Sequence, residues 1–389
     1  MTSIAILKKV GVALLAPRMS ALGEDSCGGS EVVLWEDAAI LRDAGIPVRV
    51  YASAAGSRTS VNVIRLRTSA PLITSLEYTG RLLLREPEAL LMSYNEPTAG
   101  GWAPDRTIVR FDWTTHLPRY WDWPIWRSRF RRARYLFPSE NERQIFLRQH
   151  GSMLAPNTVV VPNAVDLQLF RPMNSGATAR ASQGLRVGCA GQWSAGKGIP
   201  QLLEAWRTVK SVVPAAELYM AGGPRLWKNV GVVPQEEGST SRVREMEAQG
   251  LLHCVGTLPR SHMPTFWKSL DIAVVPSLSE SFGLVALEAL ACGVPVVSTT
   301  AGGLKEIAVD GESGLFVPPG DPAALARALL TLLTDNHLRL RLAEGAQRRA
   351  QAFSLENRSR ELLDLICEVV KKHEGDTQSR VQLMKNHAE

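Results

Sequence analysis

Short apolar runs alternate with helix-length amphipathic segments along the whole chain. Residues 10–16 (VGVALLA) have the unbroken apolar character of a buried strand. The segment from Glu31 places apolar side chains on one helical face and stops at Gly45, a residue suited to the position just after a helix. Residues 48–51 then alternate as a strand does. This strand–helix–strand order predicts a parallel, doubly wound sheet.

The same pattern continues in both halves of the chain. Two further strands of the first half are predicted at 107–110 and 134–137. Residues 172–184 are polar, rich in small residues and without apolar periodicity, which indicates a connection. In the second half, strands are predicted at 185–190, 217–221, 252–255, 271–275, 294–298 and 314–317. Helices are predicted there at 199–210, 283–292, 321–333 and 337–352.

The length of 389 residues agrees with two domains of this kind, and we find no internal sequence repeat. Both domains are predicted to be α/β, with Rossmann-like, doubly wound parallel sheets facing across a cleft. The expected boundaries are 1–170 for the N-terminal domain, 171–184 for a linker, 185–352 for the C-terminal domain, 353–372 for a helix packing back toward the N-terminal domain, and 373–389 for a frayed tail.

Composition narrows the class of protein. Hydrophobic residues make up 45% and charged residues 21%, as in a soluble globular protein, and no stretch of 18 apolar residues exists. The short run after Lys8 and Lys9 is interpreted as a strand, not a signal peptide. Five scattered cysteines without a CxxC pair argue against disulfides and zinc and favour the cytoplasm. The net charge of +6 suits anionic partners.

The segment 271–297 (DIAVVPSLSESFGLVALEALACGVPVV) is the richest in candidate chemistry. A buried strand enters a polar loop, and a helix begins near Gly283. Unpaired amides at such a helix start suit phosphate, and glycine lets phosphate approach the backbone. Glu280 and Glu288 on either side can accept hydrogen bonds from hydroxyls. Together these features indicate a nucleotide-sugar pocket; the alternative is two solvent-facing glutamates around a helix start.

A second candidate is residues 188–198 (GCAGQWSAGKG), between a predicted strand and a predicted helix. Gly191-x4-Gly196-Lys197 has the glycine and lysine spacing of a P-loop. Gly198 stands where a P-loop has the Ser or Thr that binds magnesium, which disfavours a nucleotide hydrolase. Phosphate binding by Lys197 and the loop amides is still expected. The alternative is an ordinary turn with a surface lysine. A third, weaker candidate is the glycine pair Gly28-Gly29 ahead of a helix, which suits a structural turn equally well.

These motifs, in this order, resemble the retaining GT-B glycosyltransferases of family 4, the glycosyl transferases of group 1. The resemblance is dense in the C-terminal half and patchy in the N-terminal half. It is carried by ESFGLVALEALACGVPVV with Glu280-x7-Glu288, by 301–329, 161–172 and 137–143, by Lys197-Gly198, and by CGGSE at 27–31.

The resemblance implies a role for each matching residue. Glu280 would bind sugar hydroxyls, Glu288 would bind ribose hydroxyls, and Lys197 would neutralise the leaving phosphate. Backbone contacts to the sugar and diphosphate would come from Phe282, Gly283, Leu284 and Val285. Gly28 and Gly29 would line the junction of donor and acceptor. The base would lie against Val255, Gly256, Thr257 and Leu258.

Two departures from the family pattern matter. Gln192 stands where the family often has Arg, so Arg225 after Gly222-Gly223 is a candidate replacement for that phosphate cation; otherwise the donor is held more weakly. The family also commonly has a histidine after a central N-terminal strand. His116 is our candidate catalytic residue there, and Asp112 is the alternative because the register is uncertain.

The resemblance implies transfer of a hexose from a nucleoside diphosphate sugar, with UDP-glucose expected first, and retention at the anomeric carbon. No D-x-D sequence occurs, so we expect no metal and no other cofactor. The expected acceptor is a saccharide or lipid-linked saccharide of polysaccharide or glycolipid biosynthesis. A nucleotide-sugar epimerase on the same fold and a non-hydrolytic nucleotide-binding protein are the alternatives.

Five of the ten tryptophans lie between Trp102 and Trp126, and arginines follow at once. Aromatic residues beside a basic run suit sugar stacking, a membrane surface or nucleic acid. We favour acceptor or lipid-surface binding, hence a cytoplasmic protein in peripheral contact with the inner face of the membrane and without a nucleic-acid partner. The alternative is a solvated arginine helix packing on its Trp side chains.

Overall fold

The computed structural model describes residues 3–16, 29–52, 62–65, 84, 88–112, 123–172, 184–224 and 237–386. Contacts divide the chain into two units, one of Met1–Val161 with Arg358–Glu389 and one of Pro162–Asn357. The predicted site residues Gly28, His116 and Arg225 lie outside the described residues, as does most of the predicted linker.

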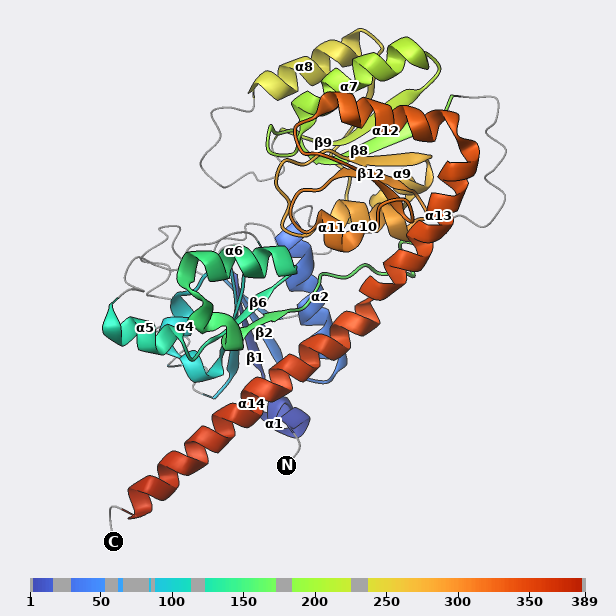
Figure 1. The fold of residues 1–389 in the computed structure, drawn as a ribbon. Helices are drawn as coiled ribbons and strands as arrows, with labels where there is room; N and C mark the ends of the chain where they lie inside the picture. Colours follow the sequence, from blue (N-terminus) through green and yellow to red (C-terminus); the bar gives the residue numbers. More distant parts are fainter. Residues whose placement is uncertain are drawn as a thin grey trace. The chain divides into compact units, whose positions relative to one another are not determined.

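The N-terminal unit has a seven-stranded parallel sheet in the order β3-β2-β1-β4-β5-β6-β7 (Figure 1). Its strands are β1 (Val12–Ala16), β2 (Val48–Ala52), β3 (Asn62–Arg65), β4 (Leu90–Tyr94), β5 (Thr107–Arg110), β6 (Arg134–Phe137) and β7 (Thr158–Val160). Its helices are α1 (Ser3–Val10), α2 (Gly29–Asp43), α4 (Thr98–Trp102), α5 (Pro124–Phe130) and α6 (Glu140–His150), with short 3₁₀ turns η1 (Pro104–Arg106) and η3 (Ser152–Asn157).

The first strand is shorter than its apolar run predicts. Val10 ends helix α1 and not a strand, and β1 begins only at Val12. Gly11 separates the two with φ +76°, and a Cβ there would lie 2.8 Å from the carbonyl oxygen of Pro47. The apolar run therefore contains a helix end, a glycine turn and a strand, which hydrophobicity alone does not separate. The predicted strands at 107–110 and 134–137 are confirmed as β5 and β6.

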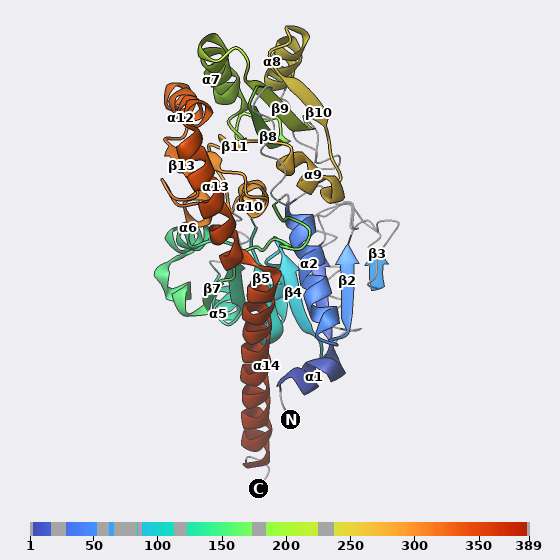
Figure 2. The ribbon, with the colours of Figure 1, turned by 90° about the vertical axis from the view of Figure 1, so that its right-hand side faces the viewer.

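The C-terminal unit has a six-stranded parallel sheet in the order β10-β9-β8-β11-β12-β13 (Figure 2). Its strands are β8 (Arg186–Gln192), β9 (Glu217–Gly223), β10 (His253–Gly256), β11 (Ile272–Val275), β12 (Val296–Thr299) and β13 (Gly314–Val317). Its helices are α7 (Ile199–Val212), α8 (Glu237–Ala248), α9 (Met263–Lys268), α10 (Leu284–Ala291), α11 (Leu304–Ile307), α12 (Pro322–Thr334) and α13 (Asn336–Ala350), with 3₁₀ turns η5 (Arg260–His262) and η6 (Gln351–Phe353).

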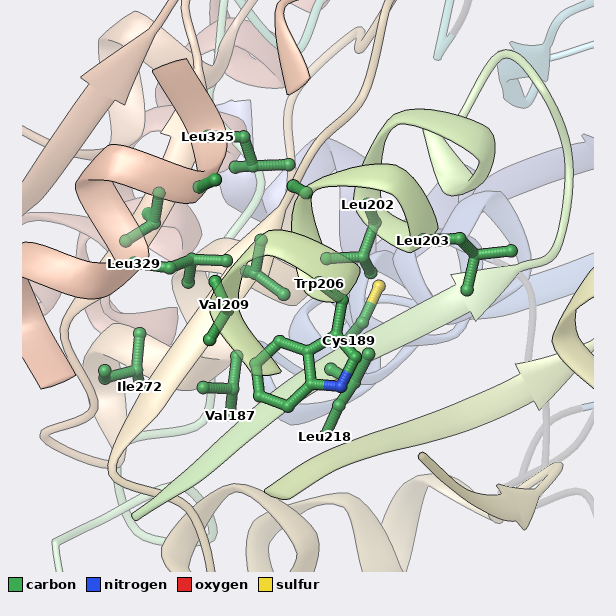
Figure 3. Packing of buried hydrophobic residues seen from close by; sticks show 14 of the residues in the cluster. Val187, Cys189, Leu202, Leu203, Trp206, Val209, Leu218, Ile272, Leu325 and Leu329 are labelled. Atoms are coloured by element: carbon green, nitrogen blue, oxygen red, sulfur yellow. The ribbon is translucent and has the colours of Figure 1, made fainter. Parts of the chain in front are cut away.

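Alternate residues of β11 enter two different cores on the two faces of this sheet. Ile272 and Val274 join a cluster with α7 and α12, whereas Ala273 and Val275 join one with α10. This is why the strand is apolar without a break. Figure 3 shows the first cluster, in which the fully buried Trp206 of α7 packs over the strands. Its indole Nε1 donates to the carbonyl of Leu251 at 2.7 Å, so the ring fills the core and keeps its polar atom bonded.

Strand order reverses at β8 in the C-terminal sheet. The chain runs outward through β9 and β10, then returns to place β11 on the other side of β8. Val187 of β8 pairs with Ile272 of β11 in parallel register. In open α/β sheets, ligands bind at the carboxyl ends of the two strands that flank such a reversal. The loops after β8 and β11 are therefore the positions where the fold favours a site.

The terminal helix α14 (Leu355–Asn386) is longer than the sequence predicts. We expected a helix to 372 and a frayed tail beyond it, but the helix continues to Asn386 because no proline interrupts it. Arg358 attaches it to the N-terminal unit: its Nε lies 3.1 Å from Asp37 of α2, and both side chains are buried. Tyr94 donates to the same carboxylate at 2.8 Å. None of the described helices is long and apolar enough to cross a membrane.

Candidate functional site

Lys197 and Glu280 meet at the strand reversal of the C-terminal sheet. Lys197 lies in the loop between β8 and α7, and Glu280 lies in the loop between β11 and α10. The Lys197 Nζ is 2.7 Å from Glu280 Oε2, with the lysine side chain 41% exposed and the glutamate 11% exposed. Ser277 Oγ donates to the same carboxylate oxygen at 3.1 Å. The pair is therefore fixed on its acidic side and open to solvent on its basic side.

Glycines bring these two loops together. Gly198 has φ +69°, and a Cβ there would lie 1.8 Å from the carbonyl oxygen of Pro276. The amide of Leu278 donates to the carbonyl of Gly196 at 2.9 Å, which joins the loops directly. A side chain at position 198 would push the β11 loop away, so the glycine that is unsuited to magnesium is needed for this close approach.

A third loop, after β12, supports the backbone of Glu280. The amide of Gly303 donates to the Glu280 carbonyl at 3.0 Å. A Cβ on Gly302 would lie only 1.8 Å from the same oxygen. The Gly302-Gly303 pair thus lets this loop pack against the main chain of Glu280 and leaves the carboxylate directed by Ser277 and Lys197.

Helix α10 begins directly beside this carboxylate. The residue before the helix, at the N-cap position, is Gly283, with φ +111° and no side-chain hydrogen bond that caps the helix. A Cβ on Gly283 would lie 2.7 Å from Leu304 Cδ2 and 3.7 Å from Glu280 Cγ. The amides of the first turn, from Leu284 and Val285 onward, have no partner within the helix, and the helix dipole adds partial positive charge there. An anion can therefore be bound next to Lys197 by backbone groups.

Glu288 is buried within α10 and is not a solvent-facing residue. It is 5% exposed. Arg260 Nη1 lies 3.0 Å from its Oε1, and Trp267 Nε1 donates to its Oε2 at 3.3 Å. Burial raises the pKa of the Glu288 carboxyl, while the Arg260 charge and the Trp267 hydrogen bond act in the opposite direction. The two donors fix the orientation of the carboxylate and favour its charged form.

The predicted base-binding segment lies at the edge of the same sheet. Gly256 ends β10 with φ +78°, and Thr257 Oγ1 is 3.7 Å from the place of a Cβ on Gly223, the last residue of β9. Leu258 packs partly against the core under α10. Since Arg260 follows two residues later and reaches Glu288, the loop after β10 and helix α10 come together at this carboxylate.

Gln192, the departure from the family pattern, is the last residue of β8 and pairs with Gly223 in register. Its side-chain amide points to the carbonyl of Pro224 at 3.5 Å. Gly222 has φ +119°, and a Cβ there would lie 1.9 Å from the Gly191 carbonyl oxygen, so the two strand ends touch through glycines. The structure places Gln192 at the strand end where a phosphate cation is expected, and it provides no charge there.

In the N-terminal unit, Gly29 is the first residue of α2. Asp112 follows β5 and is 6% exposed. Its Oδ1 lies 2.7 Å from Arg110 Nε, and its amide donates to Asn95 Oδ1 at 2.8 Å. Asn95 has the left-handed φ of +55° and follows β4, which lies next to β5. The structure therefore places Asp112 in a buried polar cluster at the carboxyl ends of central strands.

Several residues of the candidate site were missed by sequence reasoning. They are Ser277 beside Glu280, Gly302 and Gly303 under it, and Arg260 and Trp267 around Glu288. The glycine pair at 302–303, in the loop after the strand predicted at 294–298, was a usable signal. Arg260 and Trp267 gave no such signal, because they lie in a different segment from Glu288. Across the described ranges, no group of three or more His, Cys, Asp or Glu residues could hold a metal ion.

The fold and this site define a class of protein: a GT-B protein with two parallel α/β domains, in which the C-terminal unit holds Lys197 beside Glu280 and a second, buried carboxylate at Glu288. Solved structures agree with this fold. Sucrose-phosphate synthase from Thermosynechococcus elongatus superposes with a TM-score of 0.72 at 22% identity, over 92% of this chain and 98% of that one. Anabaena Alr3699/HepE in complex with UDP and glucose gives 0.71 at 20% identity, over 91% and 98%. At these identities the likeness shows the fold alone.

Residues 174–349 match the family model of the glycosyl transferases of group 1, which confirms the resemblance for the C-terminal part of the chain. A curated relative, the D-inositol 3-phosphate glycosyltransferase of Xylanimonas cellulosilytica, is 32% identical over 253 residues, covering 60% of this chain and 56% of the relative. The chain thus spans about half the length of the curated relatives that it matches.

Proposed function

We propose that this protein is a retaining hexosyltransferase that moves a sugar from a nucleoside diphosphate sugar to a hydroxyl acceptor. The observation that carries the proposal is the Lys197–Glu280 pair at the strand reversal, beside the uncapped start of α10. A cation and free amides bind a diphosphate, and a carboxylate held in place binds sugar hydroxyls. For Glu288 we propose binding of the ribose hydroxyls, and its fixed orientation, held by two donors, supports that role.

The charge balance of the reaction gives each residue its task. The bond between the anomeric carbon and the phosphate oxygen breaks, so negative charge builds up on the leaving diphosphate. Lys197 and the first amides of α10 stabilise that charge electrostatically, which lowers the barrier. The acceptor oxygen bonds to the same face of the anomeric carbon, and its proton passes to a phosphate oxygen of the leaving group. No nucleophilic residue and no metal is needed for this scheme.

UDP-glucose is the donor we propose first, and the solved Anabaena structure with UDP and glucose supports that choice. For the acceptor we propose a saccharide or a lipid-linked saccharide of polysaccharide or glycolipid synthesis, with the enzyme in the cytoplasm and peripheral at the inner membrane face. The curated relatives are named for D-inositol 3-phosphate, so that compound belongs in the acceptor panel.

The test is a thermal-shift panel of UDP-, GDP- and ADP-sugars, followed by a transfer assay with the donor that stabilises the protein most. A ligand that binds only the folded state raises the melting temperature. Lys197→Gln and Glu280→Gln are expected to lose the shift and the transfer while remaining folded. Wild-type transfer by both variants would refute the site, and turnover of donor without any acceptor would identify an epimerase instead.

A further inference from the structure

Helices α4 and α5 present an apolar, basic surface that the proposed site does not use. It consists of Trp102, Trp123, Ile125, Arg127 and Arg131, and we call it the α5 surface. Trp123 is 63% exposed, Ile125 is 67% exposed and Trp102 is 40% exposed. Arg127 and Arg131 are exposed as well. Exposed large apolar side chains on two helices that pack against each other are typical of an interaction surface.

The packing beneath this surface explains why its outer side chains are not buried. Phe130 of α5 is fully buried, and the Trp126 ring lies 6.2 Å from it and 5.3 Å from Trp102. A Cβ on Gly101 would lie 2.9 Å from both Phe130 and Trp126, so α4 and α5 pack in close contact, side by side in Figure 1. With Trp126 and Phe130 packed inward, Trp123 and Ile125 are left on the outside of α5.

The charged side chains of α5 and of the residues directly after it are all arginines. From Trp123 to Ser139 the sequence has five arginines and no Asp or Glu. Arg129 donates to the carbonyls of Gly101 and Trp102, and Arg132 pairs with Asp105 at 3.2 Å, so these two are engaged locally. The guanidinium groups of Arg127 and Arg131 both contact the uncharged thioether of Met153. Neither arginine forms an ion pair with a described residue, and both are exposed, so no carboxylate of the described part of the chain neutralises their positive charge.

We propose that the α5 surface docks on a lipid bilayer that contains anionic headgroups. Trp and Ile side chains insert at the boundary of headgroups and acyl chains, and arginines beside them bind lipid phosphates. A nucleic acid would use the arginines and the aromatic rings, but it gives no favourable environment to the aliphatic Ile125. This inference rests on the proposed function in one respect: a lipid-linked acceptor would lie in such a membrane.

Vesicle binding tests this surface without donor or acceptor. The full chain is mixed with vesicles of phosphatidylcholine alone, or of phosphatidylcholine and phosphatidylglycerol in equal amounts, and the bound fraction is measured by flotation. We expect Trp123→Ala with Ile125→Ser to lower the partition coefficient on the anionic vesicles about ten-fold. Arg127→Gln with Arg131→Gln is expected to lower it about 30-fold, at about five-fold for each arginine. Added salt is expected to weaken binding of the wild type.

As controls, comparable pairs of exposed residues are replaced on the C-terminal unit. Val212 and Leu340 are 60% and 48% exposed, and Arg341 and Arg348 are exposed. Val212→Ser with Leu340→Ser, and Arg341→Gln with Arg348→Gln, are expected to bind vesicles like the wild type, and melting curves check that every variant is folded.

Equal binding by all variants, or no binding by the wild type, would overturn the proposal. Binding of a single-stranded RNA oligonucleotide that depends on the same arginines, without vesicle binding, would assign the surface to nucleic acid. The thermal-shift panel with nucleotide sugars is a separate measurement. If the wild type binds anionic vesicles but no nucleotide sugar raises its melting temperature, the result counts against the donor site and not against the α5 surface.

Discussion

Replacing Arg260 by leucine tests how Glu288 is kept charged inside α10. In the wild type the Arg260 guanidinium lies 3.0 Å from Glu288 Oε1, with side-chain exposures of 15% and 6%. It also lies 5.4 Å from the centroid of the Phe170 ring. Leucine fills part of the same volume but leaves the carboxylate with Trp267 as its remaining donor of the two. After the substitution, the buried negative charge of Glu288 no longer has a positive charge beside it.

Removing one partner of a buried ion pair costs about 3–5 kcal/mol. We expect about 3 kcal/mol, because Trp267 still donates to Glu288 and the pair is not fully closed to water. For a unit of this size that corresponds to a fall of about 6–12 °C in the melting temperature. A smaller part, about 0.5–1 kcal/mol, is the lost contact of the guanidinium with the Phe170 ring, and it does not depend on the charge of Glu288.

The pH dependence identifies the carboxylate as the cause. Burial already raises the folded pKa of Glu288 above its ordinary value of 4.5, and loss of Arg260 raises it further. A carboxyl with a raised folded pKa binds its proton more tightly in the folded state, so stability falls as pH rises from 4.5 through the folded pKa. In the variant the folded pKa of Glu288 is higher, so stability falls over a wider range of pH than in the wild type. Its deficit against the wild type is therefore largest near pH 8 and shrinks toward about pH 5.

The assay is a melting curve at each pH for the wild type, Arg260→Leu, and Arg260→Leu combined with Glu288→Gln. The double variant has no charge at position 260 or 288 and is expected to recover most of the deficit near pH 8. A deficit of equal size at both ends of the pH range, together with a double variant no more stable than Arg260→Leu alone, would refute the reasoning.

Three further predictions follow from single contacts. Lys197→Gln is expected to lower kcat/KM for transfer about 10²–10³-fold, and to shift stability by less than about 1 kcal/mol because its ion pair is partly exposed; unfolding together with inactivation would contradict this. Gly198→Ala is expected to destabilise by about 3 kcal/mol in denaturant titration, against about 1 kcal/mol for Gly311→Ala. Both glycines have positive φ, but only the first meets a carbonyl oxygen, so equal losses would exclude the clash. Asp37→Asn removes the carboxylate that is hydrogen-bonded to the buried Arg358, and is expected to cost about 3 kcal/mol and to speed hydrogen exchange in α14; unchanged exchange would show that this ion pair does not hold that helix.

Most of the C-terminal sheet could be predicted from the sequence, for a physical reason. Strands β11 and β12 are buried at every position, so they lie in apolar runs bounded by Gly, Pro or polar residues, whereas the edge strand β10 is partly exposed. The run at 314–317 matches β13 fully, and the helix from 199 begins at the predicted residue. Hydrophobicity failed where one run held two elements, as at α1 and β1, and where a helix has little apolar surface, as in α14 beyond 372.

The candidate site was predicted as a set of residues but not as a set of contacts. The sequence places Lys197 and Glu280 after two strands, and the doubly wound topology then brings those strand ends together. It does not predict that Ser277, three residues earlier in the same loop, donates to Glu280, because the conformation of the loop decides that contact. It does not predict that Arg260 and Trp267 bind Glu288, because these two donors come from a different segment of the chain. The Gly198 example shows a related gap. From the sequence, Gly198 lacks the hydroxyl group that would bind magnesium in a P-loop. Only the structure shows why glycine is needed there: a Cβ would clash with the carbonyl oxygen of Pro276.

The most direct measurement is a crystal structure with the nucleoside diphosphate that raises the melting temperature most. The account predicts the diphosphate within hydrogen-bonding distance of Lys197 Nζ and of the first amides of α10, with a ribose hydroxyl on Glu288. A diphosphate bound elsewhere, with the Lys197–Glu280 contact and the start of α10 unoccupied by it, would contradict the account.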